Sequence, residues 1–136
     1  MRIPRQLSCF LALALTSPAF SVVTVKDAAS APGDFPFVVN KQAATIFVDK
    51  DDAEVVRIAA GMLAGDVELV AGVKPQVTTG ADKASGPVVI LGTSGKSGFI
   101  ADLVKRGKLD THAIEGKWES FVIQTIADPY PGVKSA

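Results

Sequence analysis

A short glycine-containing loop is the first feature of the sequence that could do chemistry. In VVILGTSGKSGFI (residues 88–100), an apolar run ends at Gly92, and Gly95 is followed by Lys96 and Ser97. This order partly matches the nucleotide-phosphate loop, in which four residues between the glycines let backbone N–H groups wrap around a phosphate. Only two residues separate the glycines here, so we expect no nucleotide binding. Two interpretations stay open: Ser97 caps a helix, or the amides at that helix start hold a carboxylate or sulfate beside Lys96.

Other nucleophile and metal motifs are incomplete. A serine-hydrolase elbow, G-x-S-x-G, would need glycine where Lys96 stands. His112 is the only histidine, and it lies in a polar connection without the spacing of a metal site, so we expect it to be exposed. The acidic run 49–52 lacks the glycine and the later glutamate of a calcium loop. We therefore predict no metal and no cofactor.

Carboxylates and aromatic rings are the remaining candidates. Glycoside hydrolysis needs two carboxylates held across a sugar, but no spacing singles out a pair among the acids Asp102, Asp110, Glu115 and Glu119. We therefore name no catalytic residue. Trp118 and Tyr130 could stack on a sugar ring, and Lys96 could contact an acidic one, which makes these three residues weak candidates for substrate binding. Packing in the core or at a sheet edge is the alternative role for Trp118.

Composition restricts the class of protein. The chain has 136 residues, 48% of them hydrophobic, and 14 basic residues balance 14 acidic ones. This suits one folded domain and gives no basic surface for nucleic acid. A basic start, a short apolar middle and a small-residue end predict a cleavable signal peptide at residues 1–21, too short in its apolar part to span a bilayer. We accordingly expect a secreted or periplasmic protein without a stable membrane anchor. Cleavage would remove two arginines and the lone Cys9, and the net charge would change from 0 to −2.

The elements that must position these residues follow from local patterns. Residues 22–34 are predicted to be a linker and 35–136 an α/β (α+β) domain, a small mixed sheet with two helices packed on it. The expected strands are 35–40, 44–49, 74–79 (an edge strand, because it contains Pro75), 88–91 and 117–126, and the expected helices are 52–71 and 99–106.

Further patterns refine the first helix and the end of the chain. Spacings of three and four residues predict one broad buried face for helix 52–71. Asp51 and Glu54 have the spacing of a capping box, and Gly72 is placed to end the helix. Residues 128–132 (DPYPG) predict a turn.

Three segments together resemble a known family. They are ATIFVDKDDAEVVRIAA (44–60), ASGPVVILGTSGKS (84–97) and GKWESFVIQTIADPYPGVKSA (116–136), and their order and gaps resemble the N-terminal domain of glycoside hydrolase family 115. The resemblance covers about residues 35–136. Gly61 and Gly65, inside the first predicted helix, depart from the good helix formers expected there.

The resemblance implies a parent enzyme and a non-catalytic role for this part of it. Members of the family are secreted xylan α-1,2-glucuronidases that remove 4-O-methylglucuronic acid from glucuronoxylan. They are large and often dimeric, with an opening α/β domain similar to the second domain of chitobiase-like enzymes, followed by a catalytic (β/α)8 barrel. In the family, one more strand, a glycine-rich loop and a helix follow the last segment, so we expect the domain to be incomplete at its C-terminus. The implied partners are the rest of the parent enzyme and an acidic polysaccharide. The family's catalytic residues fall outside the matched segments, so the 136-residue chain alone is expected to be inactive. The alternative is a stand-alone secreted domain that binds carbohydrate or has a structural role.

Overall fold

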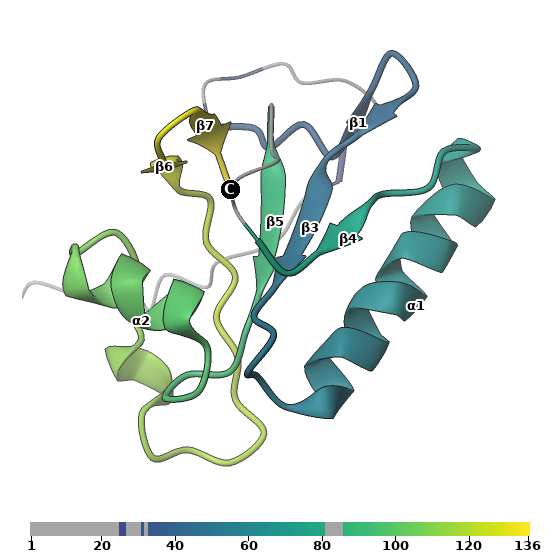
Figure 1. The fold of residues 1–136 in the computed structure, drawn as a ribbon. Coiled ribbons are helices and arrows are strands. Elements are labelled where there is room, and N and C mark those ends of the chain that lie inside the picture. The colour runs from purple at the N-terminus through teal and green to yellow at the C-terminus, as the bar shows by residue number, and fades with distance from the viewer. Residues whose placement is uncertain (1–24, 27–30, 32, 81–85) are drawn as a thin grey trace, which may run out of the picture.

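The computed structural model describes residues 25–26, 31, 33–80 and 86–136. The predicted signal peptide lies outside the described residues, and so does most of the predicted linker. The described part has an α/β (α+β) fold, as the sequence predicts, with two α-helices and three small sheets (Figure 1).

A three-stranded parallel sheet forms the centre of the molecule. Its strands are β3 (Thr45–Val48), β4 (Val77–Thr78) and β5 (Val88–Leu91), in the order β4-β3-β5. Ile46 lies between Val77 and Val89 in the register. The strands expected at 44–49, 74–79 and 88–91 are thus confirmed, the second of them at an edge. The sheet is wholly parallel, so the expectation of one mixed sheet is wrong.

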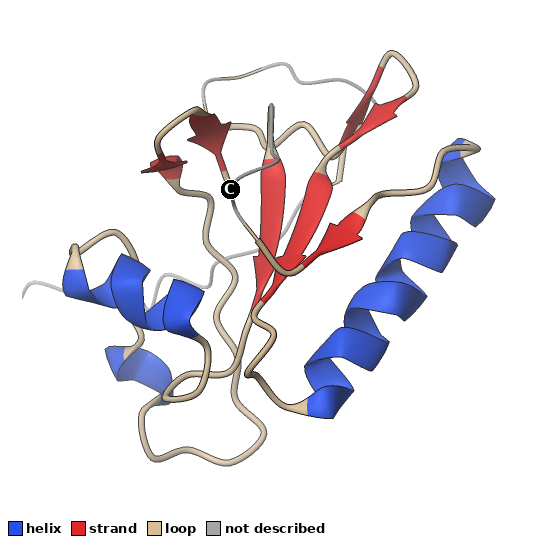
Figure 2. Cartoon of the chain, in the orientation of Figure 1, coloured by secondary structure: helices blue, strands red, loops and turns tan. Residues whose placement is uncertain are grey.

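The antiparallel pairs form separate hairpins. β1 (Val38–Val39) pairs with β2 (Gln42–Ala43), and β6 (Ala127–Tyr130) pairs with β7 (Val133–Ser135). The predicted turn is therefore only partly right, because the first part of 128–132 belongs to β6. Figure 2 shows the two hairpins beside the central sheet.

Helix α1 (Glu54–Ala71) covers one face of the sheet. Ile46 and Val48 pack there against the fully buried Ala60 and Ala64. Gly72 ends the helix in the left-handed region, with φ +69°, as predicted. The broad buried face is wrong: small alanines form the centre of the contact, and Val55, Ile58, Met62 and Val70 are 54–90% exposed.

The opposite face is covered by the second helix and the last hairpin. Phe47 and Val88 pack against Val133 of β7, with Phe99 and Tyr130 alongside. Phe99 belongs to α2 (Gly98–Lys105), and its ring centroid lies 5.9 Å from that of Phe47. Ser97 is the N-cap of α2, which confirms the capping interpretation: its Oγ accepts a hydrogen bond from the Ile100 N–H at 3.4 Å. A 3-10 turn, η2 (His112–Ile114), follows α2.

The predicted strand at 117–126 is wrong. Between η2 and β6 the chain turns at residues 115–116 and 118–119 and belongs to none of the sheets (Figure 1). All residues from 115 to 125 are exposed. A strand needs a neighbour to satisfy its backbone hydrogen bonds, and the described residues supply none to this segment.

Candidate functional site

The parallel sheet defines where a ligand site would be expected. From β3 the chain passes through α1 to β4 on one side, and then crosses to β5 on the other side. The loops that leave β3 and β5 therefore diverge at neighbouring carboxyl ends, which is where open α/β sheets bind ligands. These loops carry the acidic run 49–52 and the glycine loop 92–97.

Two aspartates of the first loop bind the backbone of the second. Asp52 Oδ2 accepts a hydrogen bond from the Thr93 N–H at 2.7 Å, and Asp49 Oδ2 accepts one from the Gly98 N–H at 2.6 Å. The other carboxylate oxygens accept hydrogen bonds from their own loop, Asp49 Oδ1 from the Asp51 N–H and Asp52 Oδ1 from the Ala53 N–H. We call these four interactions the aspartate latch. It joins the two loops that leave β3 and β5.

Hydrogen bonding lowers the pKa of both carboxyl groups. For Asp49 the main cause of the lower pKa is the hydrogen bond from the Asp51 amide, followed by the bond from Gly98. Burial acts to raise the pKa of Asp52, but the hydrogen bonds from Thr93 and Ala53 and the nearby charge of Lys96 outweigh it and keep the pKa below the ordinary value. Both groups are therefore held as carboxylates, the form that accepts hydrogen bonds best.

The latch decides between the two interpretations of the glycine loop. The Gly98 amide at the start of α2 already donates to Asp49, and the Ile100 amide donates to Ser97. The Asp49 carboxylate thus occupies the position that the second interpretation gave to an external carboxylate or sulfate. Lys96 is exposed and contributes its charge to the Asp52 environment. The loop functions as a structural connection between strand and helix.

Gly92 is required by the close packing behind this loop. A Cβ at this position would lie 2.6 Å from Ile100 Cγ1 and 2.7 Å from Ser97 Cβ. No such contact is sterically acceptable, so a larger residue would push the capping serine and the helix away.

The predicted capping box is not formed. The N-cap of α1 is Ala53, which has no side-chain cap. Asp51 pairs with Lys50 at 2.7 Å, and Glu54 pairs with Arg57 along the helix. The contact of Asp52 with the Thr93 amide could not be predicted from local patterns, because the two residues lie 41 positions apart in the chain. The one available signal was the acidic run 49–52 after the strand that ends at Val48.

Two open hollows flank the latch and the last hairpin. The first, about 500 Å³, lies between the glycine loop and the segment after η2. It is lined by Gly92, Thr93, Ser94, Ile114, Glu115, Gly116, Lys117, Ser120 and Phe121. Hydroxyl groups, one acid, one base and one aromatic ring face it, a mixture suited to binding a polar molecule but without a pair of opposed carboxylates.

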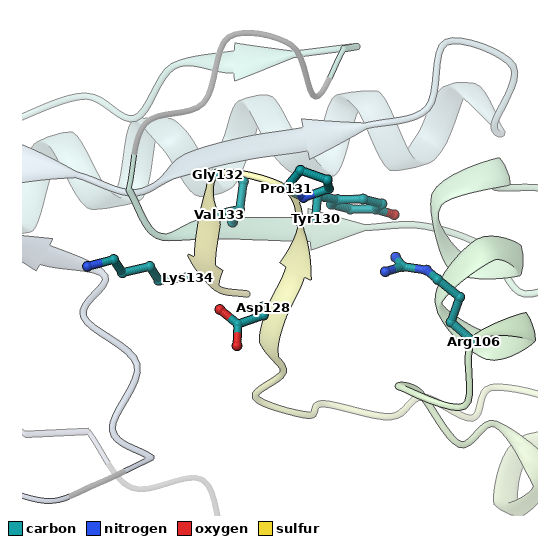
Figure 3. Close-up of a pocket in the computed structure, with 7 residues that line it drawn as sticks. All are labelled: Arg106, Asp128, Tyr130, Pro131, Gly132, Val133 and Lys134. Atoms are coloured by element: carbon teal, nitrogen blue, oxygen red, sulfur yellow. The ribbon is translucent and has the colours of Figure 1, made fainter.

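Tyr130 lies at the second hollow, about 510 Å³, shown in Figure 3. The Arg106 guanidinium lies 5.0 Å from the centroid of the Tyr130 ring, and the Tyr130 hydroxyl donates to the Phe99 carbonyl at 3.1 Å. Burial and the charge of Asp102 raise the pKa of the Tyr130 hydroxyl, although Arg106 opposes this. With one partner at its ring and another at its hydroxyl, Tyr130 anchors the β6–β7 hairpin to α2 and is not an open stacking platform.

Two basic residues at the end of α2 complete this anchor. The Arg106 guanidinium forms a salt bridge with Asp102 at 2.7 Å and also donates a hydrogen bond to the Pro129 carbonyl. Lys108 Nζ donates to the carbonyls of Ala127 and Asp128 at 2.9 and 2.7 Å. These contacts hold β6 in place, and local patterns could not predict them because the acceptors lie 19–23 residues further along the chain.

Trp118 has the opposite environment. Its side chain is 91% exposed, and the nearby Phe121 is 79% exposed. Packing in the core is therefore wrong for Trp118, and its ring is accessible from solvent. Glu119, between them, is also exposed and has a positive φ of 51°.

His112 is exposed, as predicted. Its Nδ1 lies 3.3 Å from Glu115 Oε1 and 3.7 Å from Asp110 Oδ1, with 84% of the His112 side chain in solvent. Among the residues that the structure describes, no group of three or more His, Cys, Asp or Glu side chains could hold a metal ion. No helix in the described part is long and apolar enough to cross a membrane.

Comparison with known sequences gives no family assignment. No protein-family model matches this sequence, and no curated protein does.

Proposed function

We propose that the chain is the N-terminal, non-catalytic domain of a secreted family 115 α-glucuronidase, an enzyme that removes (4-O-methyl)glucuronic acid from glucuronoxylan. The observation that carries the proposal is the order of the three family-like segments. The first two have a local structure that suits an opening α/β domain, a strand leading into a long helix at 44–60 and a strand leading into a capped loop at 84–97. The domain would pack against the catalytic part of the enzyme.

The coding sequence downstream of codon 136 tests this proposal. We expect an open frame that continues through a strand, a glycine-rich loop and a helix into a (β/α)8 barrel. The protein from that frame should release 4-O-methylglucuronic acid from glucuronoxylan by an inverting mechanism with two carboxylates. The 136-residue chain should release none under the same conditions. Release of the sugar by the short chain, or a stop codon directly after codon 136, would contradict the proposal.

A second candidate, a stand-alone carbohydrate-binding domain, is favoured by the exposure of Trp118. An aromatic ring that is 91% exposed is suited to stacking on a sugar, and its chain neighbour Lys117 lines the first hollow. This candidate predicts retardation of the chain on a glucuronoxylan affinity gel, lost in Trp118→Ala. Leu69→Ala is the matched control, because Leu69 is a similarly exposed apolar residue on α1, at 86%. If folded Trp118→Ala migrates like the parent chain, Trp118 does not bind the polysaccharide.

A further inference from the structure

One continuous segment of the chain is accessible in both its side chains and its backbone. All residues from 115 to 125 are exposed, and Figure 1 shows the first part of this segment as the yellow-green loop at the lower edge of the molecule. Within the described residues, no N–H group from Trp118 to Thr125 donates a hydrogen bond. Two side-chain hydrogen bonds hold the segment, from Ser120 Oγ to the Trp118 carbonyl and from Gln124 Nε2 to the Lys108 carbonyl. The segment can therefore change its backbone conformation without breaking a sheet or a helix.

These properties are those of a segment that an endopeptidase can bind. A protease takes its substrate as an extended strand, which it holds through main-chain hydrogen bonds. It therefore needs several consecutive residues whose backbone is not already paired. Exposed loops are the preferred sites of proteolytic cleavage, because their local opening costs almost no free energy, whereas helices and strands of the core open only with a large part of the fold.

The aromatic residues single out one class of protease. Trp118 and Phe121 are 91% and 79% exposed. The other phenylalanine and tyrosine side chains of the described residues are buried or half-buried, and Phe47 in β3 is fully buried. An endopeptidase that cleaves after aromatic residues therefore finds exposed side chains of the required type, among the described residues, in this segment alone.

The bond after Phe121 is the better placed of the two. Residues 118–119 form a turn in which Glu119 has a φ of +51°, so the bond after Trp118 lies in backbone that a protease would have to straighten. Residues 120–126 contain no turn or bend. The residues directly before and after the Phe121–Val122 bond can therefore enter an active site with little rearrangement.

We infer that the Phe121–Val122 peptide bond is a processing site for an endopeptidase that cleaves after aromatic residues. Hydrolysis consumes one water molecule, breaks the C–N bond, and leaves a carboxylate on Phe121 and an ammonium group on Val122. The reaction requires only access from this chain, since the protease supplies the catalytic groups.

The two products stay together after cleavage. The C-terminal product, residues 122–136, carries the β6–β7 hairpin, whose Val133 is 2% exposed and packs against Phe47 of the central sheet. Arg106 and Lys108 of the larger product donate hydrogen bonds to three carbonyls of β6. Cleavage therefore interrupts the chain beside the first hollow and leaves the hairpin on the sheet.

Limited digestion of the 136-residue chain with chymotrypsin tests the site, with mass spectrometry to identify the first products. Among the described residues, we expect the bond after Phe121 to be cut first. It should be cut at least about a hundredfold faster than the bonds after Phe47 and Tyr130, which become accessible only when the fold opens. In size-exclusion chromatography the two products should elute together, and they should separate only in concentrated urea.

Two variants separate the effect of side-chain exposure from that of the backbone. Phe121→Ala should remove the cut after position 121. Met62→Phe is the matched control, because Met62 is 66% exposed but lies in the middle of α1, where the backbone is helical. The bond after position 62 should be cut at least about a hundredfold more slowly than the bond after Phe121.

Three results would overturn the inference. A first cut after any other aromatic residue of the described part, Trp118 included, would show that another bond is more accessible. Equally fast cleavage after position 62 in Met62→Phe would show that exposure of the side chain alone determines the site. Products that separate without urea would show that the hairpin contacts do not hold the cleaved chain together. None of these measurements uses glucuronoxylan, so their outcome is independent of the proposed function.

Discussion

The glycine loop 92–97 and the segment 117–126 differ in the hydrogen bonds of their backbone amides and in the exposure of their apolar side chains. In the glycine loop, Asp49, Asp52 and Ser97 accept hydrogen bonds from the neighbouring amides, and Gly92 gives the helix room to approach. From Trp118 to Thr125, by contrast, no backbone amide donates a hydrogen bond among the described residues, and Trp118, Phe121 and Ile123 are in solvent. Both stand out in the sequence, but among the described residues the glycine loop has more of its backbone amides hydrogen-bonded.

This difference shows that the amides of a conspicuous motif can be hydrogen-bonded by the protein itself, whereas an ordinary apolar run can lack backbone partners. The glycine loop looks like a binding site because its glycines, lysine and serine are those of a phosphate loop, yet internal carboxylates bind its amides. The segment 117–126 looks like a routine strand in the sequence, yet it belongs to none of the three sheets of the described residues. The following substitutions test that contrast.

The largest expected difference lies between two phenylalanines. Phe47, in β3, is completely buried, and truncation to alanine should lower the free energy of unfolding by about 3–5 kcal/mol. Phe121 is 79% exposed, so Phe121→Ala should change it by no more than about 0.5 kcal/mol. Urea unfolding followed by circular dichroism measures both. Similar losses in the two variants would mean that 117–126 packs against the domain in solution, and the contrast would be lost.

Two glycines provide the next comparison. Gly92→Ala should cost about 1–3 kcal/mol because the added methyl group would overlap Ser97 and Ile100. Gly61→Ala should instead stabilise the protein by about 0.5–1 kcal/mol, since Gly61 lies inside α1 and nothing lies within 4 Å of its added Cβ. Thermal unfolding of the two variants shows directly whether each substitution raises or lowers the stability of the protein. A neutral Gly92→Ala would show that the loop is not tightly packed on α2.

The features that sequence could predict are those determined by neighbouring residues. The strand before Asp49, the long helix with its end at Gly72 and the cap at Ser97 all follow from local patterns, and all are present. The latch was not predictable in this way, because Asp49 and Asp52 bind amides 49 and 41 residues away. The strand at 117–126 failed for a related reason. Its side chains favour a strand, but a strand forms only where a second one lies beside it.

The width of the buried helix face illustrates the same limit. Spacing along α1 showed which residues share a face, but not how much of the helix a three-stranded sheet can cover. The contact is centred on Ala60 and Ala64, and residues flanking them, such as Ile58 and Met62, are left in solvent. The period of the apolar residues shows which side of the helix faces the sheet, and the size of the sheet determines how much of that side is buried.

The smallest expected effect concerns the charge of the latch and depends on pH. Asp52→Asn keeps an oxygen acceptor but loses the charge, so at pH 7 it should lower the free energy of unfolding by about 1 kcal/mol. The pKa of Asp52 is lower in the folded protein than its ordinary value of 3.8, so the unfolded chain binds more protons in the interval between the folded and unfolded pKa values. The stabilisation is therefore complete above that ordinary value and disappears as pH falls through the folded pKa. Urea unfolding between pH 7 and pH 2 should show the parent and Asp52→Asn converging on acidification, whereas Asp66→Asn, on the exposed side of α1, serves as the control. A difference in free energy of unfolding between the parent and Asp52→Asn that stays constant down to pH 2 would contradict this. It would show that the charge of Asp52 does not hold the two loops together, and the contrast between the glycine loop and the segment 117–126 would be weaker.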